Sequence, residues 1–314
     1  MTLDIVLLAA GGFGVWLGAE SMVRGAVSLA KYLGVSALVI GSTIVAFGTS
    51  APELVVSAAA AFDGHAQLAL GNVLGSNIFN IAVVLGLSAV IAPVAVSGDV
   101  LKRDMPIMPA ATLLTVLLAF LDSMISRVDG ILLLGCFAAH SYMSYRVARK
   151  DQARITQATG WEKPKFKWRN VFLLIGGTAI LALGAEGMVR GAVGIAEALG
   201  VSKTVIGLTI VAFGTSIPEL AASVVAAKHG ESDLALGNVL GSNIYNLFLI
   251  LGTTAVIAPV PSHIGVSSVE FIFFVGLALA VVPMSIIGRT VGRVRGVILF
   301  ASYVTFVLLL ISRQ

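Results

Sequence analysis

Apolar residues fall into ten long runs along the chain, most of them close to 20 residues, and short polar stretches separate these runs. A helix needs about 20 apolar residues to cross the hydrocarbon core of a bilayer. A membrane barrel would instead require strands of about ten alternating residues, which the sequence lacks. The pattern therefore predicts an all-α polytopic membrane protein with ten transmembrane helices. The predicted spans are residues 4–23, 36–62, 67–92, 105–121, 128–146, 169–189, 203–227, 233–258, 266–287 and 294–312.

The two halves of the chain repeat each other, so that each residue of the first half aligns with the residue 166 positions later. Three pairs of segments match at 15 of 20, 12 of 14 and 11 of 12 positions, namely 17–36 with 183–202, 41–54 with 207–220, and 69–80 with 235–246. Five spans are an odd number, so the second half must enter the bilayer from the opposite side. We therefore predict two inverted-topology five-helix repeats, an arrangement typical of secondary transporters with ion sites near the midplane.

One long polar segment, RVARKDQARITQATGWEKPKFKWR, separates the halves and is rich in Lys and Arg. We predict a first repeat at 1–145, a basic linker at 146–169 and a second repeat at 170–314. The positive-inside rule places the linker in the cytoplasm and both termini outside. In this topology all Lys and Arg face the cytoplasm except Arg127, Arg190, Lys203 and Arg313. We expect a multi-pass protein of a prokaryotic cytoplasmic (inner) membrane.

Composition supports a membrane protein and excludes several other classes. Hydrophobic residues make up 58% of the chain and charged residues 11%, whereas soluble domains contain about 25% charged residues. The net charge of +4 comes from loop residues, with no basic-aromatic surface for nucleic acid. The single Cys136 excludes an intramolecular disulfide and a cysteine-based metal site. The lipid bilayer is the expected environment, and no protein partner is inferred.

A glutamate lies near the middle of two predicted spans, in TIVAFGTSAPEL and TIVAFGTSIPEL. These residues, Glu53 and Glu219, each cost several kcal/mol as charges in a membrane, from roughly 2.5 kcal/mol upward. Pro52 and Pro218 precede them and lack an N–H, so each helix must kink there. Carbonyls of the preceding turn lose their helical partners and need another partner at this depth, which a cation can supply.

Each repeat thus offers a carboxylate, freed carbonyls around Thr49 or Thr215, and hydroxyl groups within about one helical turn. Inverted symmetry lets the two sets face each other and provide about six hard oxygen ligands, at the low end of what Ca²⁺ accepts. The absence of nearby thiolate or imidazole disfavours zinc and copper. The segments GNVLGSNIFN and GNVLGSNIYN add further amide and hydroxyl groups. These are Asn72, Ser76, Asn77, Asn80, Asn238, Ser242, Asn243 and Asn246.

Several of these features also have purely structural interpretations. A kink after Thr-Ser-x-Pro is ordinary in membrane helices, and the glycines of GNxxGSN suit close helix packing. The duplication of the glutamate and of the asparagines favours a site. Glu20 with Arg24, and Glu186 with Arg190, are spaced four apart near span ends and are interpreted as structural ion pairs. The four histidines show no ligand spacing and receive no role.

The two motifs GTSxPE and GNxxGSNxxN identify the chain as similar to the calcium/cation antiporter superfamily, specifically to prokaryotic sodium/calcium exchangers. The resemblance covers nearly the whole chain and implies exchange of Na⁺ for Ca²⁺ as transported substrates, with no cofactor and no enzymatic activity. It implies alternating access in which the first and sixth spans slide across the core. The residues that it implies as Ca²⁺ or Na⁺ ligands are Glu53, Glu219, Thr49, Thr215, Ser50, Ser216, Asn80, Asn246, Ser76, Ser242, Ala46 and Ala212.

Asn246 departs from part of this superfamily, because K⁺-dependent relatives carry an aspartate there. Its presence argues against K⁺ co-transport and leaves two carboxylates at the centre of the site. The short linker also leaves no room for the large regulatory Ca²⁺-binding domains of animal exchangers.

Three other functions remain open from the residues. A Ca²⁺/H⁺ antiporter on the same scaffold would use the two glutamates as proton carriers, although the hydroxyl-rich motifs favour Na⁺. A cation channel is disfavoured because inverted repeats with broken helices are typical of carriers. An intramembrane hydrolase would need a Ser-His pair, paired aspartates or a zinc site, and none is visible in the sequence. Other divalent cations such as Mn²⁺ are also open as substrates.

Overall fold

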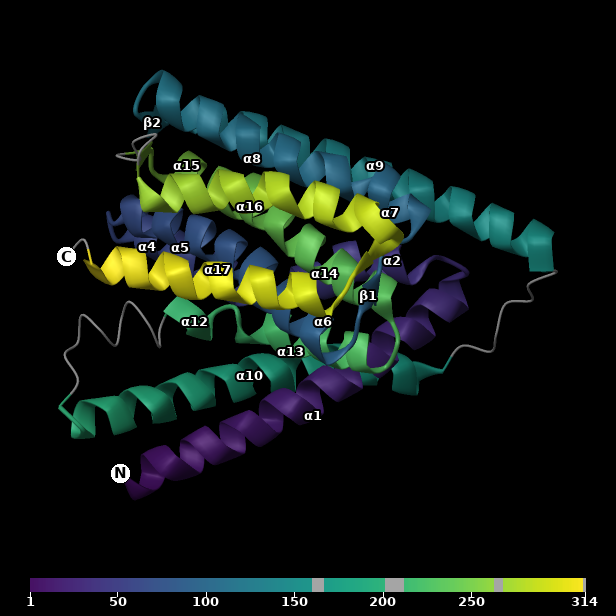
Figure 1. Cartoon of the computed structure of the whole chain (residues 1–314), viewed down its shortest axis with the longest axis horizontal. Coiled ribbons are helices and arrows are strands. Elements are labelled where there is room, and N and C mark those ends of the chain that lie inside the picture. Colours follow the sequence, from purple (N-terminus) through teal and green to yellow (C-terminus); the bar gives the residue numbers. More distant parts are fainter. Residues whose placement is uncertain (160–166, 201–211, 263–267, 313–314) are drawn as a thin grey trace.

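The computed structural model describes residues 1–159, 167–200, 212–262 and 268–312, which are almost entirely helical (Figure 1). The elements of the first half are α1 (Thr2–Leu33), α2 (Ala37–Ile40), η1 (Gly41–Val45), α3 (Ala46–Thr49), α4 (Ala51–Phe62), α5 (Ala66–Phe79), η2 (Asn80–Leu85), α6 (Gly86–Ile91), β1 (Val94–Ala95), α7 (Gly98–Lys102), α8 (Asp104–Leu121), β2 (Met124–Ile125) and α9 (Arg127–Thr159). Those of the second half are α10 (Trp168–Ala198), α12 (Ala212–Gly214), α13 (Ile217–Lys228), α14 (Ser232–Tyr245), η4 (Asn246–Ile250), α15 (Leu251–Ile257), β3 (Val260–Pro261), α16 (Val269–Ile286), η5 (Ile287–Arg289), β4 (Thr290–Val291) and α17 (Arg293–Ser312).

Within the described residues, 7 helices are long and apolar enough to cross a membrane, and the bent pair Ala37–Thr49 and Ala51–Phe62 raises the count to 8. This confirms a multi-pass helical membrane protein. The predicted span 128–146 lies within α9. The predicted span 203–227 corresponds to α12 and α13 at its end, and its first part lies outside the described residues.

Three helices extend beyond their predicted apolar runs. α1 continues past residue 23 to Leu33 and ends where Gly34 adopts the left-handed conformation with φ of 64°, which glycine takes without a steric penalty. α10 similarly continues to Ala198. α9 runs to Thr159, so the first part of the predicted linker is helical. Its Asp151 accepts a hydrogen bond of 2.8 Å from the hydroxyl of Ser36, which anchors this extension beside α2.

The helices α1 and α10 lie side by side as a pair along one side of the molecule (Figure 1). Their backbones approach closely at glycines that recur every seven residues. A Cβ added at Gly18 would lie 2.4 Å from the backbone nitrogen of Leu181, and one added at Gly184 would lie 2.6 Å from that of Val15. We call these positions the glycine seam: Gly11, Gly18, Gly25, Gly177, Gly184 and Gly191. The seam lets two long helices pack as one unit.

Two short antiparallel ladders join the halves of the chain. In one ladder Val94 of β1 pairs with Val291 of β4. In the other, Ile125 of β2 pairs with Val260 of β3. Moving both partners of the first pair to their aligned positions in the other half gives the second pair. The two ladders are thus related by the same alignment that relates the two halves in sequence.

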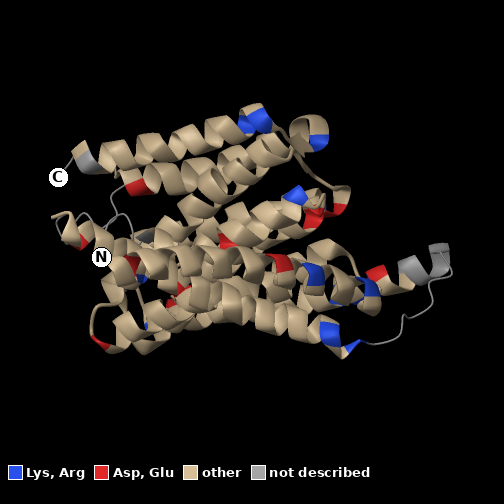
Figure 2. Ribbon diagram, turned by 90° about the horizontal axis from the view of Figure 1, so that it is seen from below, with Lys and Arg blue, Asp and Glu red and all other residues tan. Residues whose placement is uncertain are grey.

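Charged residues are sparse along the helices, and many of them lie near helix ends (Figure 2). Most Lys and Arg visible in this view lie at the end of the molecule where α9 terminates. The buried core lies between the other helices, and α14 is entirely enclosed from Leu234 to Tyr245. The second GNxxGSN motif, which lies on α14, is therefore in the protein interior rather than at the lipid surface.

Candidate functional site

The two predicted helix breaks are present and they bring Glu53 and Glu219 to the start of new helices. α3 ends at Thr49 and α4 begins at Ala51, with a bend of 45° between them. Ser50 at this break has φ of −85° and ψ of 4°, and Ser216 at the second break has φ of −96° and ψ of 5°. Each glutamate lies in the first helical turn after a break, where the helix dipole favours negative charge.

The two glutamates are held by serines from the opposite half of the chain. The hydroxyl of Ser50 donates to Oε1 of Glu219 over 2.9 Å. The hydroxyl of Ser216 lies 3.2 Å from Oε1 of Glu53 and 3.2 Å from the hydroxyl of Ser76. All five side chains are at least 97% buried. These crossed bonds join the two broken helices at one buried centre.

Asparagines of the GNxxGSN motif support the broken helices from the side. Asn72 donates to the hydroxyl of Ser57 over 3.0 Å, and Asn238 donates to that of Ser223 over 2.9 Å. These two bonds occupy aligned positions in the two halves. Asn238 also accepts a hydrogen bond of 3.1 Å from the hydroxyl of Thr49. The motif thus ties each helix that carries a glutamate to its neighbouring helix.

Several buried oxygens at the centre have no hydrogen-bond donor among the described residues. They are Oε2 of Glu53, Oε2 of Glu219, Oδ1 of Asn80, Oδ1 of Asn246 and Oγ1 of Thr215. Buried polar atoms in proteins nearly always have partners. A cation is one partner that such oxygens can take, and a set made only of oxygens suits hard cations such as Ca²⁺. Across the described part of the chain, no group of three or more His, Cys, Asp and Glu offers an alternative metal site.

Comparisons with known proteins decide which family this geometry belongs to. The family model for the sodium/calcium exchanger protein matches residues 3–146 and 169–312. The chain belongs to the sodium/calcium exchanger protein family. It is 32% identical over 348 residues to sodium/calcium exchanger MaX1 of Methanosarcina acetivorans, covering 99% of both proteins. It is 35% identical over 270 residues to inner membrane protein YrbG of Escherichia coli, covering 82% of this chain and 81% of YrbG.

The fold also matches a solved structure of this family. The sodium-calcium exchanger NCX_Mj, soaked with 10 mM Na⁺ and zero Ca²⁺, superposes with a TM-score of 0.86. The two chains are 32% identical, and the match covers 98% of each. The expected superfamily is therefore confirmed for this exchanger.

Hydrogen bonds bring Glu53, Glu219, Ser50, Ser216 and Ser76 together at the buried centre of the exchanger, whereas the two alanines differ from these residues. The carbonyl of Ala46 accepts a hydrogen bond of 3.3 Å from the hydroxyl of Thr49 and one of 3.0 Å from the nitrogen of Ser50. The single O–H of Thr49 donates either to Ala46 or to Asn238, so the Ala46 carbonyl is available to a cation when Thr49 donates to Asn238. Ala212 begins α12, and its surroundings lie outside the described residues. Ser242 is fully buried on α14.

A second buried polar cluster was not predicted. Arg103 donates to Oδ1 of Asp104 over 3.0 Å and to the hydroxyl of Ser42 over 2.6 Å. Nε2 of His140 lies 3.7 Å from the same aspartate oxygen. The sequence indicated no partner for His140, because its contact with Asp104 depends on how the consecutive helices α8 and α9 align in the folded exchanger. The cluster ties the π-helical segment η1, which leads into the first break, to the core.

The expected ion pairs are present, but they lie within α1 and α10 rather than at their ends, because these helices continue to Leu33 and Ala198. Arg24 lies 2.6 Å from Glu20, and Arg190 lies 2.5 Å from Glu186. Glu20 also interacts with Nε2 of His229 over 2.9 Å, a contact that sequence spacing gave no sign of. This contact joins α1 to the end of α13, the helix that carries Glu219.

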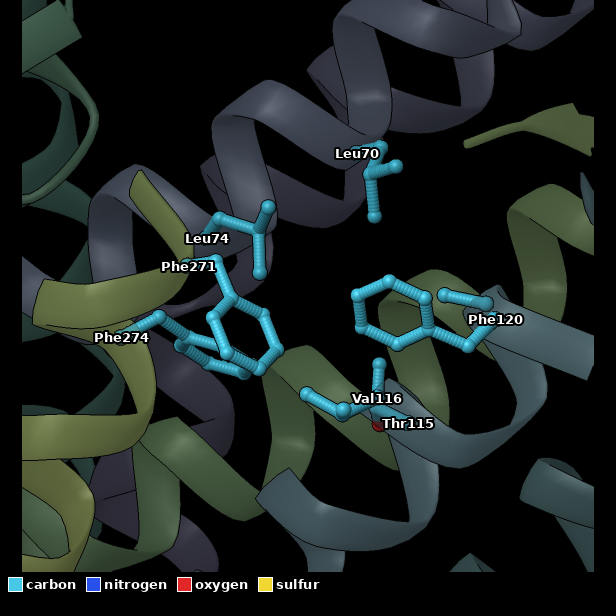
Figure 3. Close-up of a pocket in the computed structure, with 8 residues that line it drawn as sticks. Leu70, Leu74, Thr115, Val116, Phe120, Phe271 and Phe274 are labelled. Carbon is cyan, nitrogen blue, oxygen red and sulfur yellow. The ribbon is translucent and has the colours of Figure 1, made fainter. Parts of the chain in front are cut away.

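Of two cavities in the structure, one reaches the helix breaks that carry the glutamates and the other does not. One of about 860 Å³ lies between α10 and the broken helices and reaches Gly48, Pro52, Thr215 and Pro218 at the breaks. The other, about 10 Å³, lies between α5, α8 and α16 and is lined by side chains such as Leu70, Phe120 and Phe274 (Figure 3). The second barely reaches the volume of a single water and is a packing gap rather than a binding site.

Proposed function

We propose that this chain is a secondary active antiporter that exchanges Na⁺ for Ca²⁺ by alternating access, with both ions bound between Glu53 and Glu219. Members of the sodium/calcium exchanger family are transporters rather than enzymes, and the transported ions are substrates rather than cofactors. The observation that carries the proposal is the pair of buried glutamates, each bonded to a serine of the other half and each with one free oxygen. Two carboxylates neutralise one divalent cation.

The remaining ligands are proposed from their position around these carboxylates. Thr49, Thr215, Ser50 and Ser216 lie on the breaks themselves. Ser76, Ser242, Asn80 and Asn246 approach from α5 with η2 and from α14 with η4, and the carbonyls of Ala46 and Ala212 complete the set. All of the side chains in this set that the structure describes present oxygen atoms. Na⁺ and Ca²⁺ would compete for overlapping positions, which couples the two fluxes.

The proposed architecture is ten transmembrane helices in two inverted repeats, 1–145 and 170–314, joined by a cytoplasmic linker at 146–169. Two observations support it. The alignment of the two halves converts the β1–β4 ladder into the β2–β3 ladder, as is expected of two repeats related by a two-fold axis. The family model matches two segments of equal length, one in each half. The alternation of spans then places both termini outside, and the name of YrbG supports the inner membrane as the location.

The α1–α10 pair is the proposed moving unit. Its helices contact each other through the glycine seam, and the cavity of about 860 Å³ lies between α10 and the breaks, although Thr178 and Val189 of α10 still pack against Gly48 and Gly214. An empty site would carry two negative charges in a medium of low dielectric constant, so movement across it would be costly. A loaded site removes this cost, which makes the conformational change depend on bound ions.

Uptake of radioactive Ca²⁺ into proteoliposomes tests this function. Vesicles loaded with Na⁺ are diluted into K⁺ or choline medium, and a parallel set receives only a pH gradient. We expect uptake driven by the outward Na⁺ gradient and unchanged in choline, because Asn246 replaces the acid of K⁺-dependent relatives. Uptake driven only by the pH gradient would refute Na⁺ coupling and favour Ca²⁺/H⁺ antiport. Unitary currents in a planar bilayer would instead indicate a channel.

A further inference from the structure

Four buried asparagines meet where the third and eighth predicted spans cross. Asn77 and Asn80 lie at the end of α5 and the start of η2, and Asn243 and Asn246 lie at the end of α14 and the start of η4. Each is at most 2% exposed. Both π-helical segments begin at an asparagine, Asn80 or Asn246. π-helical turns inside α-helices occur frequently at functional sites.

Only one pair of these asparagines is hydrogen-bonded among the described residues. Nδ2 of Asn80 donates to Oδ1 of Asn243 over 3.2 Å. Within the described part of the chain, Oδ1 of Asn80 has no partner, and neither has Nδ2 of Asn243. The aligned residues Asn246 and Asn77 differ, because Oδ1 of Asn246 and both polar atoms of Asn77 have no partner among the described residues. The bond between Asn80 and Asn243 therefore has no counterpart there.

A carboxamide has two opposed ends, and only its oxygen can bind a cation. When the oxygen of Asn80 faces a cation, its NH₂ group points the other way into the protein interior. There the NH₂ group needs an acceptor, because an unsatisfied buried donor is costly. Oδ1 of Asn243 is that acceptor in this structure. Without it, the orientation that binds a cation would leave a buried NH₂ group unpaired.

We propose that Asn243 is a positioning residue for the cation site: it accepts the NH₂ group of Asn80 and so keeps the oxygen of Asn80 directed toward the bound ion. This inference rests on the proposed function of Asn80 as a ligand. Asn243 itself does not contact the ion, and it acts across the two repeats, from α14 onto η2. It stabilises the occupied site, because the bond holds the amide in the orientation that presents its oxygen to the ion.

A double-mutant cycle in Na⁺-driven Ca²⁺ uptake tests this role. The variants are Asn243→Leu, Asn80→Ala and both together. Loss of one buried hydrogen bond should raise the KM for Ca²⁺ in Asn243→Leu by roughly five- to tenfold, with the maximal rate little changed. In the Asn80→Ala background the same substitution should have little further effect, because the group on which it acts is gone.

Asn72→Leu is the matched control, because it removes a hydrogen bond of the same kind, made to Ser57 rather than to Asn80. Its effect on the KM should be the same with and without Asn80→Ala. Additive effects of Asn243→Leu and Asn80→Ala, or an unchanged KM in Asn243→Leu, would overturn the positioning role.

A second variant guards against failure of Asn243→Leu to fold. Asn243→Asp keeps an acceptor for the NH₂ group and should leave the KM for Ca²⁺ at or below that of the parent chain. A fivefold rise in this variant would also overturn the proposal. Absence of Na⁺-driven uptake in the parent chain would refute the proposed function itself, so the two failures are distinguishable.

Discussion

A methyl group added at Gly18 should destabilise the α1–α10 pair, because this glycine is in direct backbone contact with α10. The Cβ of Gly18→Ala would lie 2.4 Å from the nitrogen of Leu181 and 2.8 Å from the carbonyl oxygen of Gly177. Ordinary contacts of a Cβ begin at 3.4 Å. The helices must therefore separate by about 1 Å, a gap that forfeits a quarter to a half of each dispersion contact nearby.

The expected cost follows from two opposing terms. Overpacking at a rigid contact typically costs about 1–3 kcal/mol, whereas replacing a helical glycine by alanine gains up to about 1 kcal/mol in helix propensity. Gly12→Ala provides the matched control on the same helix, since its Cβ would meet only the sulfur of Met188 at 3.9 Å. Gly12→Ala should therefore gain the helix-propensity contribution without an overpacking cost. Gly18→Ala should then be less stable than Gly12→Ala by about 1–3 kcal/mol.

The two variants and the parent chain are compared by thermal denaturation in the same detergent. The measured quantity is the fraction of protein that remains monodisperse after heating. Gly18→Ala should melt below the parent chain and Gly12→Ala at or above it. If Gly18→Ala melts at the same temperature as Gly12→Ala or higher, the close approach of α1 and α10 is wrong.

Two further predictions concern buried polar groups. Ser50→Ala and Ser216→Ala each remove a donor from a buried glutamate of the opposite half, and a hydrogen bond to a charged group contributes about 1.5–3 kcal/mol. Both variants should therefore lose apparent ion affinity by roughly tenfold or more in vesicle uptake, and an effect in only one of them would contradict the crossed arrangement. Asp104→Asn leaves the guanidinium of Arg103 buried without its counter-ion, which should lower thermal stability by about 3–5 kcal/mol. Arg190→Gln is the control, because it breaks an exposed ion pair that contributes at most about 1 kcal/mol to stability. Equal thermal stability of Asp104→Asn and Arg190→Gln would refute the structural role of the buried pair.

The paired motifs made part of the site predictable from sequence. Pro52 and Pro218 lack an N–H, so the breaks before Glu53 and Glu219 follow from covalent chemistry. The presence of the same residues in both halves indicated that the two glutamates belong together. The donors of their hydrogen bonds, Ser50 and Ser216, were among the ligands that the resemblance to sodium/calcium exchangers implied.

Other features depend on how helices align in the fold rather than on spacing along the chain. The contact between His140 and Asp104 joins two consecutive helices, α8 and α9, but it depends on their relative alignment. The hydrogen bond from Asn80 to Asn243 likewise forms only where two helices cross. Helix ends were misjudged because apolar runs mark the hydrocarbon core, whereas a helix continues as long as its residues favour it. α9 continues through RVARKDQARITQAT for this reason.

Binding of Ca²⁺ to the purified chain in Na⁺-free detergent solution tests the central claim most directly. Isothermal titration calorimetry of the parent chain, of Glu53→Gln and of Glu219→Gln measures whether the two buried carboxylates form one site. We expect saturable Ca²⁺ binding to the parent chain that added Na⁺ displaces, and no measurable binding to either variant, because each loses one of the two charges that neutralise the ion. Ca²⁺ binding of undiminished affinity in both variants would show that the ion binds elsewhere and would contradict the account.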